Sequence, residues 1–361
     1  MVRLWALLAS AASYADAMLN SLFKKLSQGA ALSAPEITLV VEALTDEKLP
    51  APLKADFLVE LARKGETPEE IAAFATELRG RALPVPLDAE TRARDILDVC
   101  GTGGDHLGTF NISTTVALIV ASAGVTVAKH GNRAITSKSG SADVLETLGI
   151  RIDLTPAEAA RSLKEQHFAF LFAPHYHPAF KHIGPARKLC AERGQRTIFN
   201  FLGPLLNPVR PTCQLIGVSR AELCEPMAKV LQELGVRRGM VVSGRVGDQQ
   251  LDELSTLGLS DIAEFYQDRG FARSTLDPRD FPVGPATLAD LAGGDREANA
   301  AIIRALLAGE ERGPKRDAVL LNAGAAFFVA GRTRSIAEGW ELAATQIDSG
   351  AALQKLKTLA G

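Results

Sequence analysis

The chain has 361 residues, and its 40 Lys and Arg against 42 Asp and Glu give a formal net charge of −2. This balance excludes a protein that coats nucleic acid, because such proteins carry a basic excess that neutralises phosphates. A hydrophobic content of 47% excludes a disordered chain, and the length favours two domains or one domain with a smaller lobe.

Residues 1–17 contain Arg3, an apolar run and small residues, and in this respect they resemble a secretory signal. The alternative, which we favour, is that translation begins at Met18, because the first well-formed amphipathic helix starts there. Residues 1–17 would then be an extension that is not part of the fold. Elsewhere no run of 18 apolar residues occurs, so we expect no membrane span.

The four cysteines lie far apart and form no C-x-x-C pattern, which argues against a zinc site or a disulfide framework. Their neighbours are apolar, so we expect the thiols to fill buried space in a reducing, cytoplasmic protein. The residues concerned are Cys100, Cys190, Cys213 and Cys224.

Residues 18–85 carry helical patterns throughout, with apolar residues at i, i+3, i+4 and i+7. Ser33 with Glu36, and Thr67 with Glu70, have the spacing of capping boxes, in which each side chain satisfies a free backbone N–H of the first helical turn. These signals predict a small all-helical domain over residues 18–85.

Residues 86–361 follow a proline-rich linker and show a different pattern, in which short apolar runs alternate with helical segments. Near-continuous apolar strands separated by helices are typical of a mostly parallel sheet with helices on both faces. The fold class expected is therefore α/β, with a mostly parallel central sheet flanked by helices. The runs are residues 96–100, 125–128, 168–172, 215–218 and 240–242.

A glycine-rich turn follows the first predicted strand. Gly101, Gly103 and Gly104 allow a backbone with positive φ, and they let peptide N–H groups approach a ligand closely. Asn111 and Ser113 then open a helix, whose N-terminal N–H groups and dipole attract anions. The turn is neither a P-loop nor a dinucleotide fingerprint. It predicts a phosphate-binding turn, with a plain strand–helix turn as the alternative.

A second loop, residues 129–143, leaves the end of the next predicted strand. It offers hydroxyl groups, glycines and the cations Lys129, Arg133 and Lys138. In an open α/β sheet the ligand crevice lies at the carboxyl ends of the strands. The two loops together predict a site for a phosphorylated sugar.

These loops and the motifs that follow them resemble the anthranilate phosphoribosyltransferase family, in the same order from Met18 to the C-terminus. The matching stretches are Gly101–Asp105, Asn111–Thr114, Lys129–Arg133, Ser139–Asp143, Phe172–Pro174, Tyr176–Pro178, Arg196–Asn200, Leu202–Leu205, Asn207–Pro208 and Leu251–Ser255. The resemblance implies a fold like that of nucleoside phosphorylases and phosphoribosyltransferases. Its helical domain would be completed by a segment near residues 185–210, and a cytoplasmic homodimer would form through that domain.

The activity that the resemblance implies is transfer of the phosphoribosyl group of 5-phosphoribosyl 1-pyrophosphate (PRPP) to the amine of anthranilate. The products would be N-(5-phosphoribosyl)anthranilate and pyrophosphate, in tryptophan biosynthesis. Residues assigned to PRPP by the resemblance are Gly101, Gly104, Asp105, Thr109, Asn111, Ile112, Ser113, Thr114, Lys129 and Ser141.

Two Mg²⁺ ions per subunit are also implied by the resemblance, with Ser113 on one ion and Asp252 with Glu253 on the other. Mg²⁺ prefers hard oxygen ligands and keeps some of its waters, so few protein ligands are needed. Without the motif context, an adjacent pair of acids is more often a solvated surface feature.

For anthranilate, the resemblance points to Arg187, whose planar guanidinium matches a carboxylate. A surface arginine on a helix is the alternative. No histidine is assigned as a general base, because the amine is neutral and nucleophilic, so catalysis rests on positioning and electrostatic stabilisation. Asn132 would accept the amine, and the remaining assigned residues are Gly101, His130, Tyr176, His177 and Pro204.

Two segments, 188–195 and 244–250, are longer than the family pattern suggests. One rival function is a pyrimidine nucleoside phosphorylase, whose loop of the type Lys-His-Ser-Thr-Gly-Gly differs from Lys129–Arg133. The other is a non-catalytic nucleic-acid-binding relative, against which the near-neutral charge and the Asp252–Glu253 pair argue.

Overall fold

The structure is a computed structural model that describes residues 18–134, 138–267 and 270–361. The expectation for residues 1–17 lies outside the described residues. The chain forms two compact units. The first comprises the described residues up to Ala82 together with His177–Leu206, and the second comprises Leu83–Tyr176 and Asn207–Gly361. Within the described residues, no helix has the length and apolar character needed to cross a membrane.

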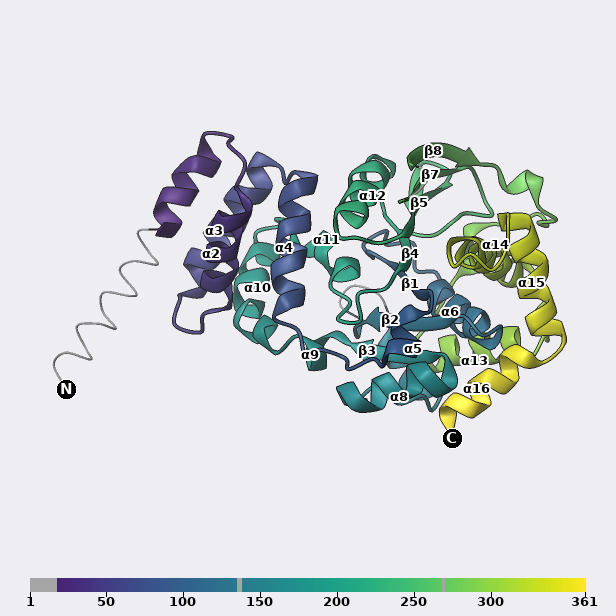
Figure 1. Ribbon diagram of the computed structural model, residues 1–361. Coiled ribbons are helices and arrows are strands. Elements are labelled where there is room, and N and C mark those ends of the chain that lie inside the picture. Colours follow the sequence, from purple (N-terminus) through teal and green to yellow (C-terminus); the bar gives the residue numbers. More distant parts are fainter. Residues whose placement is uncertain (1–17, 135–137, 268–269) are drawn as a thin grey trace. The chain divides into compact units, whose positions relative to one another are not determined.

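The helical unit is built from two stretches that are distant in sequence. Residues 18–27 are helical and precede α2 (Ala34–Thr45), α3 (Ala51–Lys64) and α4 (Pro68–Gly80). The second stretch supplies η1 (Pro178–His182), α10 (Gly184–Glu192), α11 (Phe199–Leu202) and η2 (Gly203–Leu205). Figure 1 shows the teal α10 among the purple helices, where it packs against α3.

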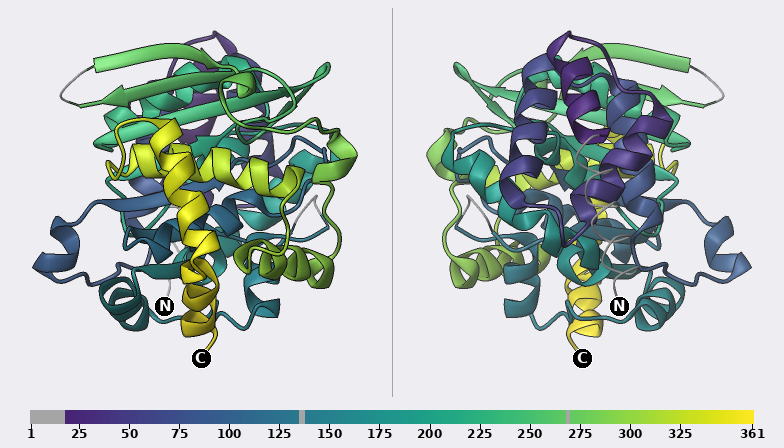
Figure 2. Two further views of the ribbon diagram at one scale, coloured as in Figure 1. Left: turned by 90° about the vertical axis from the view of Figure 1, so that its right-hand side faces the viewer. Right: turned by 90° about the vertical axis from the view of Figure 1, so that its left-hand side faces the viewer.

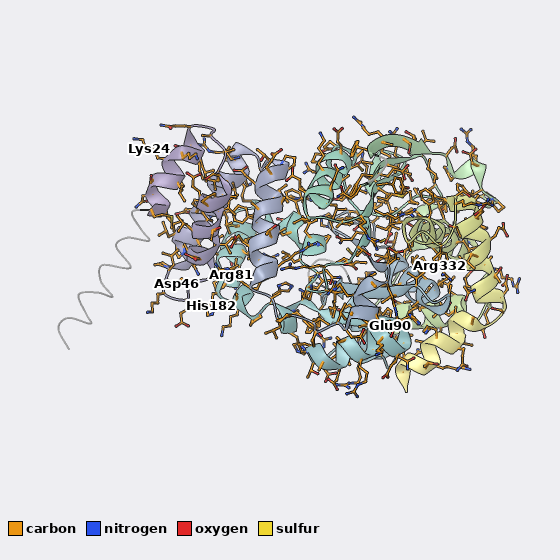
Figure 3. The ribbon with its side chains drawn as sticks, viewed as in Figure 1. Lys24, Asp46, Arg81, Glu90, His182 and Arg332 are labelled. Carbon is orange, nitrogen blue, oxygen red and sulfur yellow. The ribbon has the colours of Figure 1, made fainter. Side chains whose placement is uncertain are left out.

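A buried lysine joins the two stretches of the helical unit. Lys54 is 1% exposed, and its Nζ donates to the carbonyl oxygens of Asp46 at 2.6 Å and of His182 at 2.9 Å. Asp46 and His182 are labelled in Figure 3. Burial lowers the pKa of Lys54. The two carbonyls satisfy the ammonium that burial would otherwise leave without hydrogen bonds. The segment His177–Leu206 is thereby tied to the end of α2.

Both predicted capping boxes form. The backbone N–H of Ser33 donates to the Glu36 carboxylate at 2.7 Å, and Thr67 exchanges hydrogen bonds with Glu70. The helical unit ends at Ala82, whereas the sequence pattern predicts its end at residue 85. Leu83 belongs to the second unit, where its N–H donates to the Tyr176 carbonyl of the same unit at 2.8 Å.

The second unit has an eight-stranded sheet in the order β3-β2-β1-β4-β5-β7-β8, with β6 paired to β5. The first five strands are parallel, as the apolar runs predict, whereas β6, β7 and β8 are antiparallel additions that were not predicted. Their bounds are β1 Ile96–Gly101, β2 Thr126–Gly131, β3 Phe168–Phe172, β4 Cys213–Gly217, β5 Arg238–Val246, β6 Gln249–Leu251, β7 Ser260–Tyr266 and β8 Gly270–Leu276.

Helices cover both faces of this sheet. The helix after β1, α6 (Ile112–Ser122), packs against α14 (Pro314–Val329), α15 (Ile336–Asp348) and α16 (Ala351–Ala360). It shares a large apolar cluster with Leu97 and Val99 of β1. On the other face α8 (Pro156–Gln166) packs against β3, in a smaller cluster with Ile96. Neighbouring residues of β1 thus face opposite layers, as in a sheet buried on both sides. In the left view of Figure 2, the yellow α15 and α16 lie in front of the sheet.

The helices of the second unit are α5 Ala89–Ala93, α6 Ile112–Ser122, α7 Ser141–Thr147, α8 Pro156–Gln166, α9 Ala173–Tyr176, α12 Cys224–Glu233, α13 Arg296–Leu307, α14 Pro314–Val329, α15 Ile336–Asp348 and α16 Ala351–Ala360, with short 3₁₀ turns η3 Ala221–Leu223, η4 Pro278–Asp280 and η5 Leu288–Leu291. All four cysteines are buried free thiols, which confirms the prediction that they fill buried space.

Candidate active site

Glycines end three neighbouring parallel strands of the second unit. Gly101 ends β1, Gly131 ends β2 and Gly217 ends β4, so all three lie at the carboxyl edge of the sheet. A Cβ added to Gly217 would overlap the carbonyl oxygen of Asp252, and one added to Gly101 would overlap its carboxylate. The segment that carries Asp252 therefore crosses the strand ends where side chains are absent.

The glycine-rich turn after β1 has positive φ at Gly103 (72°) and Gly104 (82°), as predicted. The prediction of positive φ at Gly101 is wrong, because this glycine is required by the close approach of Asp252. The N–H of Gly103 donates to Asp252 Oδ2 at 2.7 Å. This N–H thus orients a carboxylate of the site.

Three carboxylates meet at this edge: Asp105 from the turn, and Asp252 and Glu253 after β6. Burial first, and then the charges of Asp105 and Glu253, raise the pKa of Asp252 well above its usual value. Burial raises the pKa of Glu253 to about 7, although Lys129 and Ser113 act in the opposite direction. Both acids are therefore costly to keep ionised in this surrounding, and a bound cation would stabilise their charged forms.

The donor set fits Mg²⁺, since all of it is oxygen. Among the described residues, no group of three or more His, Cys, Asp and Glu side chains could hold a metal ion by itself. Mg²⁺ commonly uses one or two carboxylates and completes its shell with water and substrate phosphate, so a pair suffices. The N–H of Ser113, in the first turn of α6, donates to Glu253 Oε1 at 3.1 Å. Ser113 and Glu253 are in contact, although the resemblance assigned them to different ions.

Lys129, at the end of β2, lies inside this cluster. It is 1% exposed, and its Nζ donates to the Val99 carbonyl at 2.6 Å and lies 3.4 Å from Ser113 Oγ. Its charge lowers the pKa of Glu253. Lys129 therefore acts as an internal counter-charge to the carboxylates.

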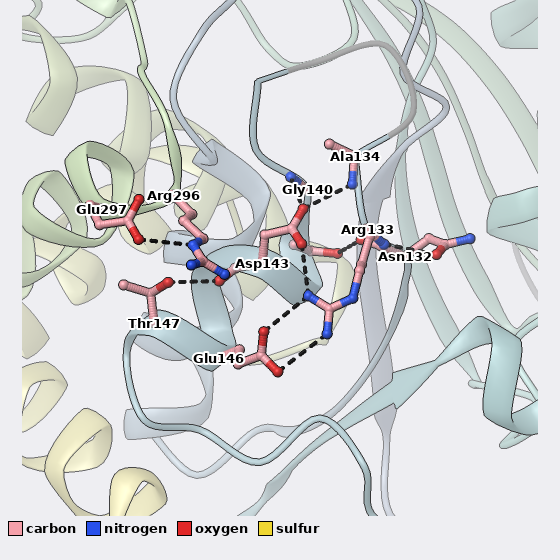
Figure 4. A network of polar contacts seen from close by, with 10 residues as sticks. Asn132, Arg133, Ala134, Gly140, Asp143, Glu146, Thr147, Arg296 and Glu297 are labelled. Atoms are coloured by element: carbon pink, nitrogen blue, oxygen red, sulfur yellow. Dashed lines mark hydrogen bonds and ion pairs between the residues drawn. The ribbon is translucent and has the colours of Figure 1, made fainter.

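Arg133 does not offer the uncompensated cation expected from the second loop. Its guanidinium pairs with Asp143 at 2.9 Å and with Glu146 at 3.0 Å (Figure 4). Asp143 also accepts the backbone N–H groups of Ala134 and Gly140, each at 2.9 Å. The charge of Arg133 stabilises the connection between β2 and α7.

Asn111, the residue before α6, uses its side-chain amide within the protein. Its Nδ2 donates to the Ser139 carbonyl at 3.2 Å, and its Oδ1 accepts from Asn299 of α13 at 2.9 Å. Ser141 begins α7, and its hydroxyl donates to the Asn132 carbonyl at 3.3 Å. Of the remaining residues assigned to PRPP, Ile112 and Thr114 are buried in the first turn of α6, Gly104 lies in the turn after β1, and Thr109 bridges to Ala292.

Four residues assigned to anthranilate lie in the second unit, and one of them is Gly101 at the end of β1. The backbone N–H of His130 donates to Asp98 Oδ1 at 3.3 Å, and Asn132 is exposed. Tyr176 is 1% exposed in the apolar cluster under α8, and its hydroxyl donates to the Leu154 carbonyl. Burial raises its pKa to about 12. The Tyr176 ring thus packs within the apolar cluster, and its assignment to the anthranilate slot stays a prediction.

Arg187, His177 and Pro204 belong to the helical unit. The Arg187 guanidinium lies over the Phe199 ring, 5.3 Å from the centroid, and Phe199 meets Phe180 edge-on. Phe180 in turn stacks on His177, at 5.1 Å. Pro204 is buried in η2. The two phenylalanines were missed, although Phe199 lies within the motif Arg196–Asn200.

The charge states of Arg187 and His177 suit an anionic ligand. Among the residues that the structure describes, no carboxylate forms an ion pair with Arg187, and burial lowers its pKa. Burial lowers the pKa of His177 to about 4, so its imidazole is neutral at pH 7. The guanidinium is therefore available to a carboxylate ligand.

Both segments that are longer than the family pattern, residues 188–195 and 244–250, belong to defined elements of the structure. Residues 188–195 complete α10 and its end, where Gly194 has φ 67° and Arg193 pairs with Asp56 of α3. Residues 244–250 extend β5 into a hairpin with β6, directly before Asp252. Gln250 Oε1 accepts the Ala221 N–H at 2.6 Å, which holds this hairpin against η3.

Two family profiles match the chain. The one described as the helical bundle domain of a glycosyl transferase family matches residues 20–82, and the one described as its a/b domain matches residues 93–353. A small helical domain beside an α/β domain with a mostly parallel sheet confirms the predicted fold class.

Relatives and solved structures agree with these profiles. The anthranilate phosphoribosyltransferase of Lacticaseibacillus casei is 46% identical over 342 residues, which cover 95% of this chain and 96% of the relative. The structure of the enzyme of that name from Thermus thermophilus superposes with a TM-score of 0.84 at 42% identity, over 94% of this chain and 98% of its own. That from Saccharomyces cerevisiae, in complex with PRPP and Mg, has a TM-score of 0.83 at 28% identity, over 94% and 96%.

Proposed function

The chain belongs to the anthranilate phosphoribosyltransferase family, and from that membership we propose how its residues carry out the reaction. It transfers the phosphoribosyl group of PRPP to the amine of anthranilate, giving N-(5-phosphoribosyl)anthranilate and pyrophosphate in tryptophan biosynthesis. The observation that carries the assignment of roles is the adjacent pair of half-buried Asp252 and buried Glu253, held against the turn after β1 and the first turn of α6.

PRPP binds at the carboxyl edge of the sheet. The open backbone of the glycine-rich turn and the start of α6 approach its phosphate oxygens, and the hydroxyl-bearing residues add donors. Lys129 balances the carboxylates within the protein. The residues assigned to PRPP remain Gly101, Gly104, Asp105, Thr109, Asn111, Ile112, Ser113, Thr114, Lys129 and Ser141.

Two Mg²⁺ ions per subunit would be held by Ser113, Asp252 and Glu253 together with PRPP oxygens and water. When bound, Mg²⁺ neutralises the charge of the pyrophosphate, which is otherwise a poor leaving group. The protein holds the acid pair in place: the Gly103 N–H orients Asp252, and the Ser113 N–H orients Glu253.

Anthranilate is bound through its carboxylate by Arg187, which has no competing carboxylate partner among the described residues. Asn132 is assigned to the amine, and Gly101, His130, Tyr176, His177 and Pro204 are assigned to the ring. No residue serves as a strong base, because the neutral amine attacks C1 as pyrophosphate departs. The rate enhancement comes from positioning and from stabilising the developing charge.

We also propose that the chain is a cytoplasmic homodimer formed through the helical unit. The support is a pair of large apolar side chains on that unit, since Phe23 and Leu39 are each 37% exposed. Large apolar side chains in contact with water are the kind of surface that a second copy of the chain would cover.

The first experiment is a fluorescence assay. We expect purified protein to consume anthranilate fluorescence only when PRPP and Mg²⁺ are both present. The double variant Asp252→Ala with Glu253→Ala should keep its fold and lose most of this activity. Thymidine phosphorolysis in place of anthranilate consumption would overturn the proposal, and an unchanged Mg²⁺ dependence in the double variant would remove the metal assignment.

A further inference from the structure

Asn322, in the middle of α14, is a polar residue in an otherwise apolar stretch of that helix. It is 0% exposed, and its side-chain amide makes three hydrogen bonds. Its Oδ1 accepts the Leu254 N–H at 2.9 Å, while its Nδ2 donates to the carbonyl oxygens of Leu254 at 3.0 Å and Ala318 at 2.9 Å. Two of these bonds pair both the N–H and the carbonyl oxygen of Leu254.

Leu254 directly follows Glu253 in the chain. Its N–H belongs to the peptide that joins Glu253 to Leu254, so a bond to that N–H fixes the direction in which the chain leaves the acid pair. Only a side chain that both donates and accepts can form this pair of hydrogen bonds, and an amide provides both groups. An aliphatic residue in its place would leave two buried backbone groups unpaired.

The other side of the same segment lies against the strand ends. A Cβ on Gly217 would overlap the Asp252 carbonyl, and one on Gly244 would lie 2.6 Å from the Glu253 carbonyl oxygen. Asp252 and Glu253 therefore lie on a backbone that is enclosed between glycines of β4 and β5 and an amide of α14. Neither the glycines nor Asn322 touch the carboxylate oxygens of Glu253, so each acts on them through the backbone.

We propose that Asn322 is a positioning residue that sets the orientation of Asp252 and Glu253 toward Mg²⁺. The inference rests on the metal assignment of the proposed function. Asn322 contacts neither substrate nor metal in this role. Its contribution is to keep both acids in one geometry before the ion arrives, which lowers the cost of ordering them on binding.

The test measures metal binding without turnover. Mn²⁺ serves as the probe, in the presence of PRPP and the absence of anthranilate, and free Mn²⁺ is followed by electron paramagnetic resonance. We expect Asn322→Leu to raise the apparent Kd of Mn²⁺ at least tenfold. Asn322→Ser, which leaves room for a water, should give a smaller rise and serves if the leucine variant does not fold.

The matched control is Ile347→Ala on α15, which removes a buried side chain far along the chain from the acid pair. It should lower the Tm to a similar extent and leave the Kd of Mn²⁺ within twofold of the wild-type value. Equal Kd values for Asn322→Leu and wild type, or equal weakening in both variants, would overturn the inference. If the wild-type protein itself binds no Mn²⁺ under these conditions, the metal assignment fails first and the inference falls with it.

Discussion

Gly217 ends β4 where the backbone of Asp252 crosses the strand ends, and the absence of a side chain is what makes that crossing possible. The absence of a side chain at Gly101 likewise leaves room for the Asp252 carboxylate. The clustered glycines of the first turn were visible in the sequence, because they lie within four residues of one another. The roles of Gly217 and Asn322 were not visible in the sequence, because both residues lie far along the chain from the segment around Asp252 that they contact. Asn322 is 68 residues from its partner Leu254.

The substitution Gly217→Ala tests this crossing. The added methyl group must displace the Asp252 backbone, so we expect kcat/KM to fall at least tenfold, about 1.4 kcal/mol of transition-state stabilisation, with a higher Mg²⁺ requirement. Gly80→Ala, at a glycine with open space around its Cβ, is the control and should keep wild-type kinetics. Wild-type Mg²⁺ dependence in Gly217→Ala would show that the crossing tolerates a side chain.

At the scale of elements, β1–β5 could be predicted because each is an apolar run between helical segments. β8 could not, since six of its seven residues are exposed and it carries no such run. β6 has only three residues and forms as the return strand of the β5 hairpin. The connection from β2 to α7 was predicted as a loop that presents cations, but its arginine is committed to an ion-pair network around Asp143.

Asp143→Ala should loosen that connection. It removes two charge-assisted bonds to the backbone N–H groups of Ala134 and Gly140, each of a kind that contributes about 1.5–3 kcal/mol. Asn132 and Ser141 flank these bonds, so we expect the KM for PRPP to rise at least fivefold, with a smaller change in kcat. Steady-state kinetics at saturating anthranilate measures both.

Glu146→Ala provides the comparison for Asp143→Ala. It removes only the other carboxylate of the Arg133 network, at a largely solvent-exposed site, and leaves both backbone bonds of Asp143 in place. Exposed ion pairs contribute about 0–1 kcal/mol, so this variant should behave like wild type. If both variants raise the KM equally, the ion pair and not the pair of backbone bonds holds the connection.

For the whole molecule, the net charge of −2 hides an uneven distribution. Three carboxylates, of which Glu253 is buried and the other two are half-buried, lie with one buried lysine at the sheet edge. The helical unit holds a neutral histidine and an arginine without a carboxylate partner among the described residues. Composition could exclude a polyanion-coating protein, but it could not reveal these local charges. They arise only when residues distant in sequence come together in each unit.

Acid should destabilise the helical unit through the buried imidazole of His177. Burial lowers the pKa of His177 from 6.5 to about 4, so the unfolded chain binds a proton at higher pH than the folded unit does. The stability that this provides is complete above pH 6.5 and is lost as the pH falls toward 4. At about 1.36 kcal/mol for each pH unit, the loss is about 3 kcal/mol.

The variant His177→Gln tests this argument, because it removes the titrating group. The free energy of unfolding of this variant, measured in denaturant melts between pH 7 and 4, should fall less steeply than that of wild type. Phe180→Leu removes the ring that stacks on His177 but no titrating group, and it should lower stability by a similar amount at each pH. Parallel curves for wild type and His177→Gln would contradict the prediction, because the acid sensitivity would then lie elsewhere in the protein.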